Sequence, residues 1–389
     1  MTIQGLSTRA CLWLLLASCP LVAAVEHLAP FDNIPSPVAS YTIVDLGETD
    51  IELTRLSKAA KKLTLAPSLN NDGIIIGNTS KGGFVTLPGG WCFAPQYDGM
   101  VINFHSINTK GDLLVAVQRG HESVEWMRWP CKDGGDYGTN REHIKTVDPF
   151  VSKFYVAGFN DESTMIAYAP GSDSAFRPLT WDSCQGLTRL GVFQDLDIKG
   201  TARGISKNGT VVGVFDTTSD QTPYVWNPYC GLLTANNYRQ YLDPTGWVEF
   251  ADLLITEDST VYGTYWVKHL AETYVVRGHY YETRQSNGSY YQYNAFTWKP
   301  ASGQVEMADL QGMRLTAVNK DHVLVGSLLN SAALRLPGKE PLTLESLVEP
   351  SEVKDWKLLE ITDINDRGQV VGYGWYQDKM HLFLANPLR

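Results

Sequence analysis

The residues with the clearest capacity for recognition chemistry gather in one aromatic stretch between positions 264 and 294. Tyrosine and tryptophan combine a rigid apolar ring with a polar tip, which suits contact with sugars and with protein surfaces. We predict that the contact surface contains Tyr265, Trp266, Tyr274, Tyr280, Tyr281, Tyr290, Tyr291 and Tyr293. The alternative is that these rings alternate between the two faces of an extended hairpin, so that half of them pack on the body of the protein.

Signals for catalysis or metal binding are weaker. His269, Glu272, His279 and Glu282 would have to cluster across a hairpin to hold a metal, and exposed strand positions explain them equally well. The loop at 133–138 offers carboxylates and glycines but lacks the regular acidic spacing of a calcium loop. The sequence contains no nucleophile elbow, zinc-protease helix motif or phosphate-binding loop. We therefore predict no catalytic residue, metal or cofactor, and a role without catalysis is favoured over an enzyme.

The elements that must position these residues come from an internal repeat. Each copy has a turn residue of the Asn type, two or three polar residues, often a glycine, then an apolar run that ends in glycine. The turn residues are Asn70, Asn108, Asn160, Ser206, Thr256, Asn319 and Asn365. A period of about 40–50 residues is typical of propeller blades or of helical arrays.

Short apolar runs between Asn, Asp, Gly and Pro favour strands and turns over helices. Asn and Asp tolerate a left-handed backbone and glycine adopts it freely, so each Asn-x-x-Gly stretch predicts a tight hairpin. Further strands follow in most copies, as at 224–228, 295–300 and 305–310. Four strands per copy and seven copies predict an all-β protein, a β-propeller of seven four-stranded blades.

The ends of the repeat array predict how the ring closes. The last copy stops after its third strand, whereas residues 41–47 resemble a fourth strand that has no first three. Pairing the N-terminal strand with the last blade would remove an exposed sheet edge. We therefore predict one domain over 41–389, with an insertion at about 264–294; an open solenoid or two half-domains is the alternative.

The repeat resembles the bacterial HAF repeat of exported extracellular repeat proteins. The resemblance rests on Gly-Ile-Asn-x-x-Gly-x-Val-Val-Gly followed by Ala-Phe-x-Trp, and residues 202–213, 295–298, 361–372 and 381–384 carry it best. The His-Ala-Phe that names the family is approximated by residues 294–296 and 381–383. The resemblance implies a propeller-like fold and export, and it implies no activity, because the repeat is scaffold.

The N-terminus predicts export. Residues 1–24 have the charge and the short apolar run of a signal peptide. Cleavage before Val25 competes with a lipobox reading, in which Cys19 is the lipidated first residue of a lipoprotein. Three prolines make residues 25–40 an extended tether. The expected location is the periplasm, the cell surface or the medium.

Four cysteines follow the predicted signal peptide, and an even number in an exported protein favours disulfides. Each follows an aromatic residue at the end of a predicted third strand, which places them in equivalent turns. We predict bridges Cys92–Cys131 and Cys184–Cys230; free thiols or another pairing is the alternative. A zinc site is disfavoured because Cys-x-x-Cys is absent.

The overall charge limits the partners. The net charge is −10, and no basic patch stands out, which argues against nucleic acid as a partner. We predict an exported binding or scaffold module that recognises a protein or a glycan, with a membrane contact only through a lipid anchor. The alternatives are a carbohydrate-active enzyme that uses two carboxylates on the same face, and a purely structural envelope protein.

Overall fold

The computed structural model describes most of the chain after residue 40. The described ranges are 41–49, 66–79, 82–87, 90–93, 100–119, 124–130, 141–145, 154–190, 198–216, 221–229, 231–235, 247–270, 281–282, 289–308, 310 and 312–388. Residues Ala39–Arg389 form one compact unit. The predicted signal peptide, Cys19 and the tether lie outside the described residues. In these ranges no helix has the length and the hydropathy to cross a bilayer.

Blades one to four each contain four antiparallel strands in chain order. Blade one has β2 (Ser68–Leu69), β3 (Ile75–Thr79), β4 (Gly82–Leu87) and β5 (Gly90–Phe93). Blade two has β6 (Met100–Ile107), β7 (Leu113–Arg119), β8 (Glu125–Trp129) and β9 (Glu142–His143). Blade three has β10 (Tyr155–Phe159), β11 (Met165–Pro170), β12 (Phe176–Asp182) and β13 (Gly186–Arg189). Blade four has β14 (Gly200–Ile205), β15 (Val211–Asp216), β16 (Gln221–Asn227) and β17 (Gly231–Thr234).

Blades five to seven carry small additions to this plan. Blade five has β18 (Trp247–Ile255), β19 (Val261–Leu270), β21 (Ser289–Lys299) and β22 (Gln304–Ala308), and β20 (Tyr281–Glu282) also pairs with β21. Blade six has β23 (Arg314–Val318), β24 (Leu324–Leu328), β25 (Ser331–Arg335) and β26 (Leu342–Thr343), then the short helices η3 (Leu344–Leu347) and α2 (Pro350–Val353). Blade seven has β27 (Trp356–Ile364), β28 (Val370–Tyr376), β29 (Lys379–Pro387) and β1 (Tyr41–Glu48). The prediction of a seven-bladed β-propeller with four-stranded blades is confirmed.

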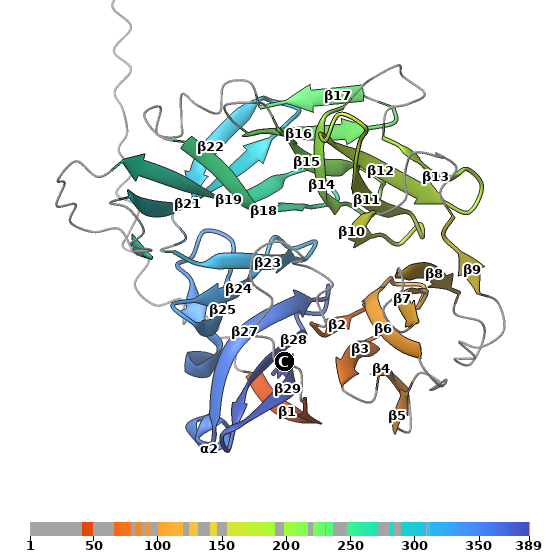
Figure 1. Ribbon diagram of the computed structural model, residues 1–389. Coiled ribbons are helices and arrows are strands. Elements are labelled where there is room, and N and C mark those ends of the chain that lie inside the picture. The colour runs from red at the N-terminus through yellow and green to blue at the C-terminus, as the bar shows by residue number, and fades with distance from the viewer. Residues whose placement is uncertain are drawn as a thin grey trace, which may run out of the picture. The chain divides into compact units, whose positions relative to one another are not determined.

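The N-terminal strand closes the ring as predicted. β1 pairs antiparallel with β29 from Tyr41 opposite Pro387 to Glu48 opposite His381. Figure 1 shows this strand in red beside the dark blue β29. The last blade is therefore built from both ends of the propeller, and its third strand has no free edge.

The core lies between neighbouring blades. Ile76 and Val85 of blade one, for example, pack with Phe104, Val115 and Trp129 of blade two, and all five are at most 2% exposed. Removing one such side chain from water contributes about 1.5–3 kcal/mol. A single thin blade cannot bury both of its faces alone, so the repeats stabilise one another through these shared clusters.

In blades four, six and seven, the glycine that ends the apolar run is explained by a close backbone approach. A Cβ at Gly213 would collide with the carbonyl oxygen of Thr201, and one at Gly372 with that of Glu360. Both carbonyls belong to the first strand of the same blade, next to a β-bulge. The sequence pattern therefore preserves room for the inner strand to bend.

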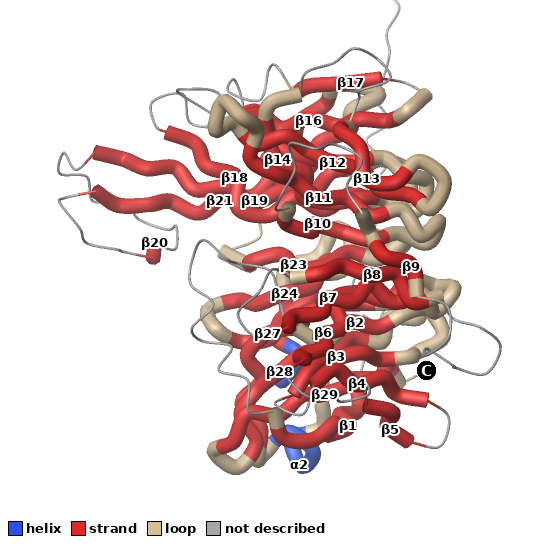
Figure 2. The backbone as a smooth tube through the Cα atoms, turned by 45° about the vertical axis from the view of Figure 1, so that its right-hand side comes forward, coloured by secondary structure: helices blue, strands red, loops and turns tan. Residues whose placement is uncertain are grey.

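The aromatic insertion is a continuation of blade five. β19 and β21 remain paired from Val261 opposite Trp298 out to Leu270 opposite Ser289, and Figure 2 shows them side by side. An extended hairpin therefore lies within the insertion, and residues 264–270 and 289–294 are its strands. Residues 271–280 and 283–288, which include Tyr274 and Tyr280, lie outside the described residues.

The cysteines do not all occupy equivalent turns. Cys92 lies on β5, the fourth strand of blade one, opposite Val85, because the third strand ends earlier than predicted, at Leu87. Cys184 does lie in the turn after the third strand of its blade, where its thiol is exposed and unbonded. Cys131 and Cys230 lie outside the described residues, so both bridges stay predictions.

Candidate functional site

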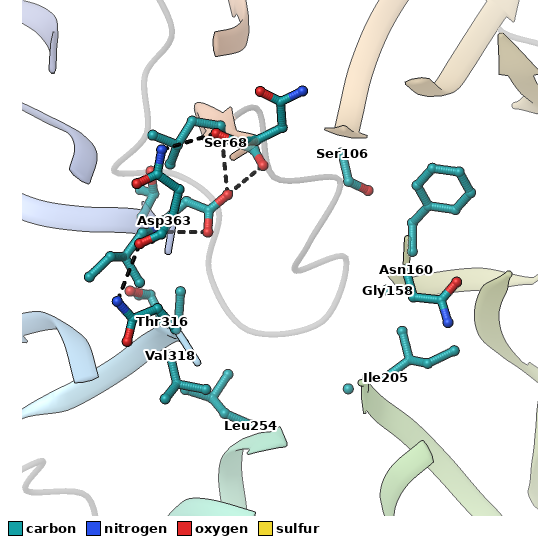
Figure 3. Close-up of a pocket in the computed structure, with 18 of the residues that line it drawn as sticks. Ser68, Ser106, Gly158, Asn160, Ile205, Leu254, Thr316, Val318 and Asp363 are labelled. Carbon is teal, nitrogen blue, oxygen red and sulfur yellow. Dashed lines mark hydrogen bonds between the residues drawn. The ribbon is translucent and has the colours of Figure 1, made fainter. Parts of the chain in front are cut away.

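The centre of the propeller is hollow where the seven repeat turns meet. The first strand of each blade and the turn that follows it line a cavity of about 590 Å³. These innermost strands are β2, β6, β10, β14, β18, β23 and β27. Figure 3 shows side chains from several of them facing the open centre. Each blade thus contributes one edge to a single site.

The turn residue organises its own hairpin first. The amide oxygen of Asn70 accepts hydrogen bonds from the backbone N–H groups of Asp72 (3.0 Å) and Ile74 (2.9 Å). Asn319 and Asn365 accept the same pair of bonds in their turns. In all seven turns, the backbone three residues later has positive φ. These residues are Gly73, Gly111, Ser163, Gly209, Ser259, His322 and Gly368.

The other end of the asparagine amide links one blade to the next. Asn365 Nδ2 donates to the carbonyl of Asn70 (3.0 Å), and Asn70 Nδ2 donates to that of Asn108 (3.2 Å). Asn108 donates to the carbonyl of Asn160 (3.2 Å), Asn160 to Ser206 (3.1 Å) and Asn319 to Asn365 (3.2 Å). Buried amides therefore link blades at five of the seven joints around the cavity, including the point where the ring closes.

The residue after each turn residue lies at the rim of the cavity. The seven rim residues are Asn71, Thr109, Asp161, Lys207, Glu257, Lys320 and Asp366. Lys207 lies between Glu257 (3.6 Å) and Asp161 (3.7 Å), and these carboxylates, Glu257 first, raise the pKa of its ammonium. Asp366 accepts bonds from Asn71 Nδ2 (2.8 Å) and from the backbone of Lys320 (3.1 Å). The acidic rim groups are thus partly neutralised by neighbours.

Below the rim, the wall formed by blades six and seven is polar. Arg314 Nη2 lies 3.3 Å from Glu360 Oε1, which gives an ion pair without hydrogen-bond geometry. Tyr373 donates its hydroxyl proton to the other Glu360 oxygen. Burial, and then the Glu360 carboxylate, raise the pKa of Tyr373, so the phenol stays protonated. This wall satisfies most of its own polar groups.

Asp363 joins the last blade to the first. It accepts hydrogen bonds from Ser68 Oγ and from the backbone N–H groups of Leu69 (3.1 Å) and Ile364 (2.9 Å), and Figure 3 shows it beside Ser68. Burial raises the pKa of this carboxyl, while the three donors oppose that shift. Three fixed donors indicate a structural joint rather than a group free to exchange protons with a substrate.

The wall formed by blades three to five is largely apolar. Ala157, Gly158, Ile205 and Leu254 line it. Figure 3 shows Gly158 and Ile205 across the cavity from Asp363 and Thr316, with Leu254 beside Val318. Among the described residues of β10, β14 and β18 that line this wall, Arg203 has the one charged side chain. Its Nε is buried without a hydrogen-bond partner. The cavity therefore has one polar wall and one apolar wall that carries a single arginine.

The arrangement is suited to holding a ligand. Among the described residues, no group of three or more His, Cys, Asp or Glu side chains is placed to bind a metal ion. A cavity that joins an apolar wall to a few convergent polar groups is the usual form of a small-ligand site.

Tyr265, the one predicted contact residue whose side chain is described, does not line this cavity. Tyr265 is 1% exposed and packs against Phe250 and Phe296, so its ring belongs to the blade core and not to a contact surface. Trp266 lies opposite Tyr293 in the β19–β21 register. Tyr290 pairs with His269, Tyr291 with Lys268 and Tyr281 with Gln292. The outer hairpin thus brings these backbone positions together away from the centre.

Sequence reasoning missed Arg203, Glu360 and Tyr373. The sequence did contain a signal for Arg203, because it lies three residues before the turn residue Ser206. His105 and Thr362 lie at the same spacing before their own turn residues, Asn108 and Asn365. Alignment of the repeats on the turn residue would have placed these three side chains at one level of the ring. Nothing local indicates that Tyr373, on the second strand of its blade, reaches the same cavity.

Comparisons with known proteins yield similarity of structure alone. No family model and no curated protein matches the chain. An inactive variant of virginiamycin B lyase from Staphylococcus aureus, solved with quinupristin, matches over 90% of this chain and 100% of its own at 7% identity, with a TM-score of 0.48. A chain of the mitotic checkpoint complex matches over 98% and 99% at 9% identity (TM-score 0.45). Acylaminoacyl peptidase matches over 80% of this chain and 50% of its own at 12% identity (TM-score 0.44). These likenesses say nothing about the ligand or activity of this chain.

Proposed function

We propose that this protein is a binding module whose ligand enters the central cavity from the side of the repeat turns. The observation that carries the proposal is the cavity itself, of about 590 Å³, lined by all seven blades. Propeller blades are a common scaffold for binding surfaces, because rigid strands hold the variable turns in place. A volume in this range matches a small molecule or a few residues of a peptide.

The main competing function is a carbohydrate-active enzyme with two carboxylates in the cavity. Such an enzyme needs one carboxyl group that is free to donate a proton and a second that faces the substrate. Glu360 is held by Tyr373 and Arg314, Asp363 by Ser68 and two backbone groups, and Asp366 by Asn71. These contacts favour binding over hydrolysis.

The extended hairpin of blade five is a second candidate contact surface. The observation that favours it is the register, which places Trp266 opposite Tyr293 and Lys268 opposite Tyr291 beyond the part of the blade that β22 covers. Aromatic positions close in space are typical of protein and glycan recognition. We propose this role for the hairpin residues other than Tyr265.

The proposal of export belongs with this function. It rests on the predicted signal peptide and on the resemblance to HAF repeats, whose glycine and apolar pattern recurs through the seven turns. A binding module of this kind would act in the periplasm, on the cell surface or in the medium, where a lipid on Cys19 would be its one membrane contact.

A blocking experiment tests the cavity. Thr109 lies on the rim, and Thr109→Trp should cover part of the opening, whereas Lys339→Trp adds the same ring on an outer turn. Thermal-shift screening of the purified protein against glycans, short peptides and small organic acids supplies ligands. We expect Thr109→Trp to abolish the ligand-induced shift and Lys339→Trp to preserve it. Ligands that bind both variants equally would show that the cavity is not the site.

A further inference from the structure

The geometry points to an organic carboxylate with a short apolar stem as the ligand of the central cavity, with the Arg203 guanidinium as its anchor. This inference rests on the proposed binding function and names the ligand class of that site. It depends on the position of Arg203 in its strand, on the residues around it, and on the ion pairs and hydrogen bonds that the other charged side chains of the cavity already make.

Arg203 is the bulged residue of the innermost strand of blade four. The β14–β15 register shifts between Ala202 and Gly204. The same shift occurs at His105, Ala157, Thr316 and Thr362 in four other blades. All five residues line the cavity. A bulge re-aims a side chain, so these bulges present one residue from each of five blades to the centre.

The other bulged residues are already engaged or have no functional group. Thr316 Oγ1 donates to the carbonyl of Ile361 (2.7 Å) and Thr362 Oγ1 to that of Pro67 (2.7 Å), so both hydroxyls link neighbouring blades. His105 Nδ1 lies 2.9 Å from Ser106 Oγ. Ala157 carries only a methyl group. Arg203 differs, since its guanidinium makes no hydrogen bond or ion pair with another described residue, and its Nε is buried.

The charges that line the cavity indicate that the ligand is negatively charged. The acidic groups that line the cavity have partners, including Lys207 for Asp161 and Glu257, and Arg314 for Glu360. Arg203 is therefore a cation without a counter-ion in the described part of the site. Leaving the buried Nε without a partner is costly, and a carboxylate can satisfy the planar guanidinium with two parallel hydrogen bonds.

The size and charge of the anion follow from the surroundings. A multiply charged anion such as phosphate would meet the rim carboxylates of Asp161, Glu257 and Asp366, whose repulsion opposes a second negative charge. The wall on either side of Arg203 consists of Ala157, Ile205 and Leu254. An apolar chain attached to a single carboxylate would cover this wall and leave the polar wall of blades six and seven in contact with water.

Isothermal titration calorimetry with matched probes tests the inference. Hexanoate and its neutral analogue hexanamide differ in the charged group alone. Acetyl-Gly-Leu and its C-terminal amide present the same chemistry at a peptide end, so the two pairs distinguish a free acid from a peptide carboxylate. We expect at least one acid to bind, and to bind about tenfold or more tightly than its amide, because a charge-assisted pair is lost in the amide.

Variants of the full protein complete the test. Arg203→Gln should abolish the preference for acid over amide, Arg203→Lys should retain part of it, and Lys339→Gln, which removes an equal charge on an outer turn, should leave it unchanged. Arg203→Gln should keep the wild-type melting temperature, since Arg203 holds no blade joint. Equal binding of acid and amide, unchanged binding by Arg203→Gln, or no binding of either acid would overturn the inference. If other ligands are then lost in Thr109→Trp, the proposed function survives while the ligand class is wrong.

Discussion

The joints between blades fall into two kinds, and the contrast explains what the asparagine of the repeat contributes. Five joints use an asparagine amide that donates to the carbonyl of the next turn residue. Blades four and five have Ser206 and Thr256 at this position, and their hydroxyls bond within their own turns. Asn208 Nδ2 then reaches Glu257 O (3.0 Å), and Tyr262 Oη lies 2.8 Å from His322 Nδ1.

The comparison separates two tasks that one asparagine performs together. Its oxygen closes the local hairpin, which a serine or threonine hydroxyl also does, as Ser206 Oγ shows by accepting from Thr210 N (3.1 Å). Its nitrogen crosses to the next blade, which a short hydroxyl side chain does not do here. The repeat thus tolerates Ser and Thr as turn residues, and the joint then depends on residues elsewhere in the turn.

The largest expected effect is the loss of an asparagine joint at the ring closure. Asn365 is 3% exposed; its oxygen accepts from Arg367 N and Gln369 N (both 3.0 Å), and its nitrogen donates to the carbonyl of Asn70 and to Gln369 Oε1. Asn365→Ala should lower the free energy of unfolding by about 4 kcal/mol, at about 1 kcal/mol for each of the four bonds. Ser206→Ala should cost about 1 kcal/mol, because Asn208 Oδ1 still accepts from Thr210 N. Denaturant unfolding measures both, and equal losses would refute the division of tasks.

The next effect concerns the left-handed turn position, which both kinds of joint share. Gly209 has φ +79°, and a Cβ there would meet no atom within 4 Å. Gly209→Ala should therefore cost about 1 kcal/mol through backbone conformation alone. Ser259→Gly, at φ 65° in the next turn, should change stability much less, since relief of strain is offset by the greater freedom of glycine in the unfolded chain. Thermal unfolding of the two variants tests this, and a neutral Gly209→Ala would contradict it.

Restoring the missing amide should give a smaller effect of opposite sign. Ser206→Asn places a donor where Asn160 and Asn319 have theirs, opposite the carbonyl of Thr256. One added hydrogen bond should stabilise the protein by about 0.5–1 kcal/mol. Asn160→Ser is the reciprocal control and should destabilise it. If Ser206→Asn lowers the melting temperature, blades four and five lie in a geometry that the amide cannot bridge.

The smallest effects are those of acid on two contrasting joints. Burial raises the pKa of Asp363, so the folded protein holds this proton more tightly than the unfolded chain, and its contribution to stability grows as pH falls below the raised pKa. The pKa of Asp258 is lowered, since hydrogen bonds from Thr256 and Thr260 and the nearby His322 outweigh its desolvation. Its contribution is therefore lost as pH falls toward the lowered pKa.

Relative to wild type, Asp363→Asn should lose stability on acidification and Asp258→Asn should gain it, as melting curves between neutral and mildly acidic pH would show. Shifts of the same sign would be inconsistent with these two pKa directions.

The repeat alone determined most of the architecture. The Asn-x-x-Gly turns, the apolar runs and the final glycine predict hairpins and four-stranded units because each depends on local backbone conformation and on the period-2 alternation of a strand. The missing strand of the last copy and the isolated segment at 41–47 predict the closure, which β1 and β29 confirm. These features are local, or are counted along the chain, and so they are visible in the sequence.

The tertiary structure alone decided which side chains meet. The bond from Asn365 to Asn70 and the bond from Ser68 to Asp363 each join residues 295 positions apart, and only the closed ring brings them together. The burial of Tyr265 follows from the neighbouring ring of Phe296 and not from its own aromatic stretch. Arg203 faces a shared cavity because a bulge turns it inward and because six other blades complete the wall. A strand pattern specifies a blade, whereas contacts across blades depend on the rotation between them, which the pattern does not encode.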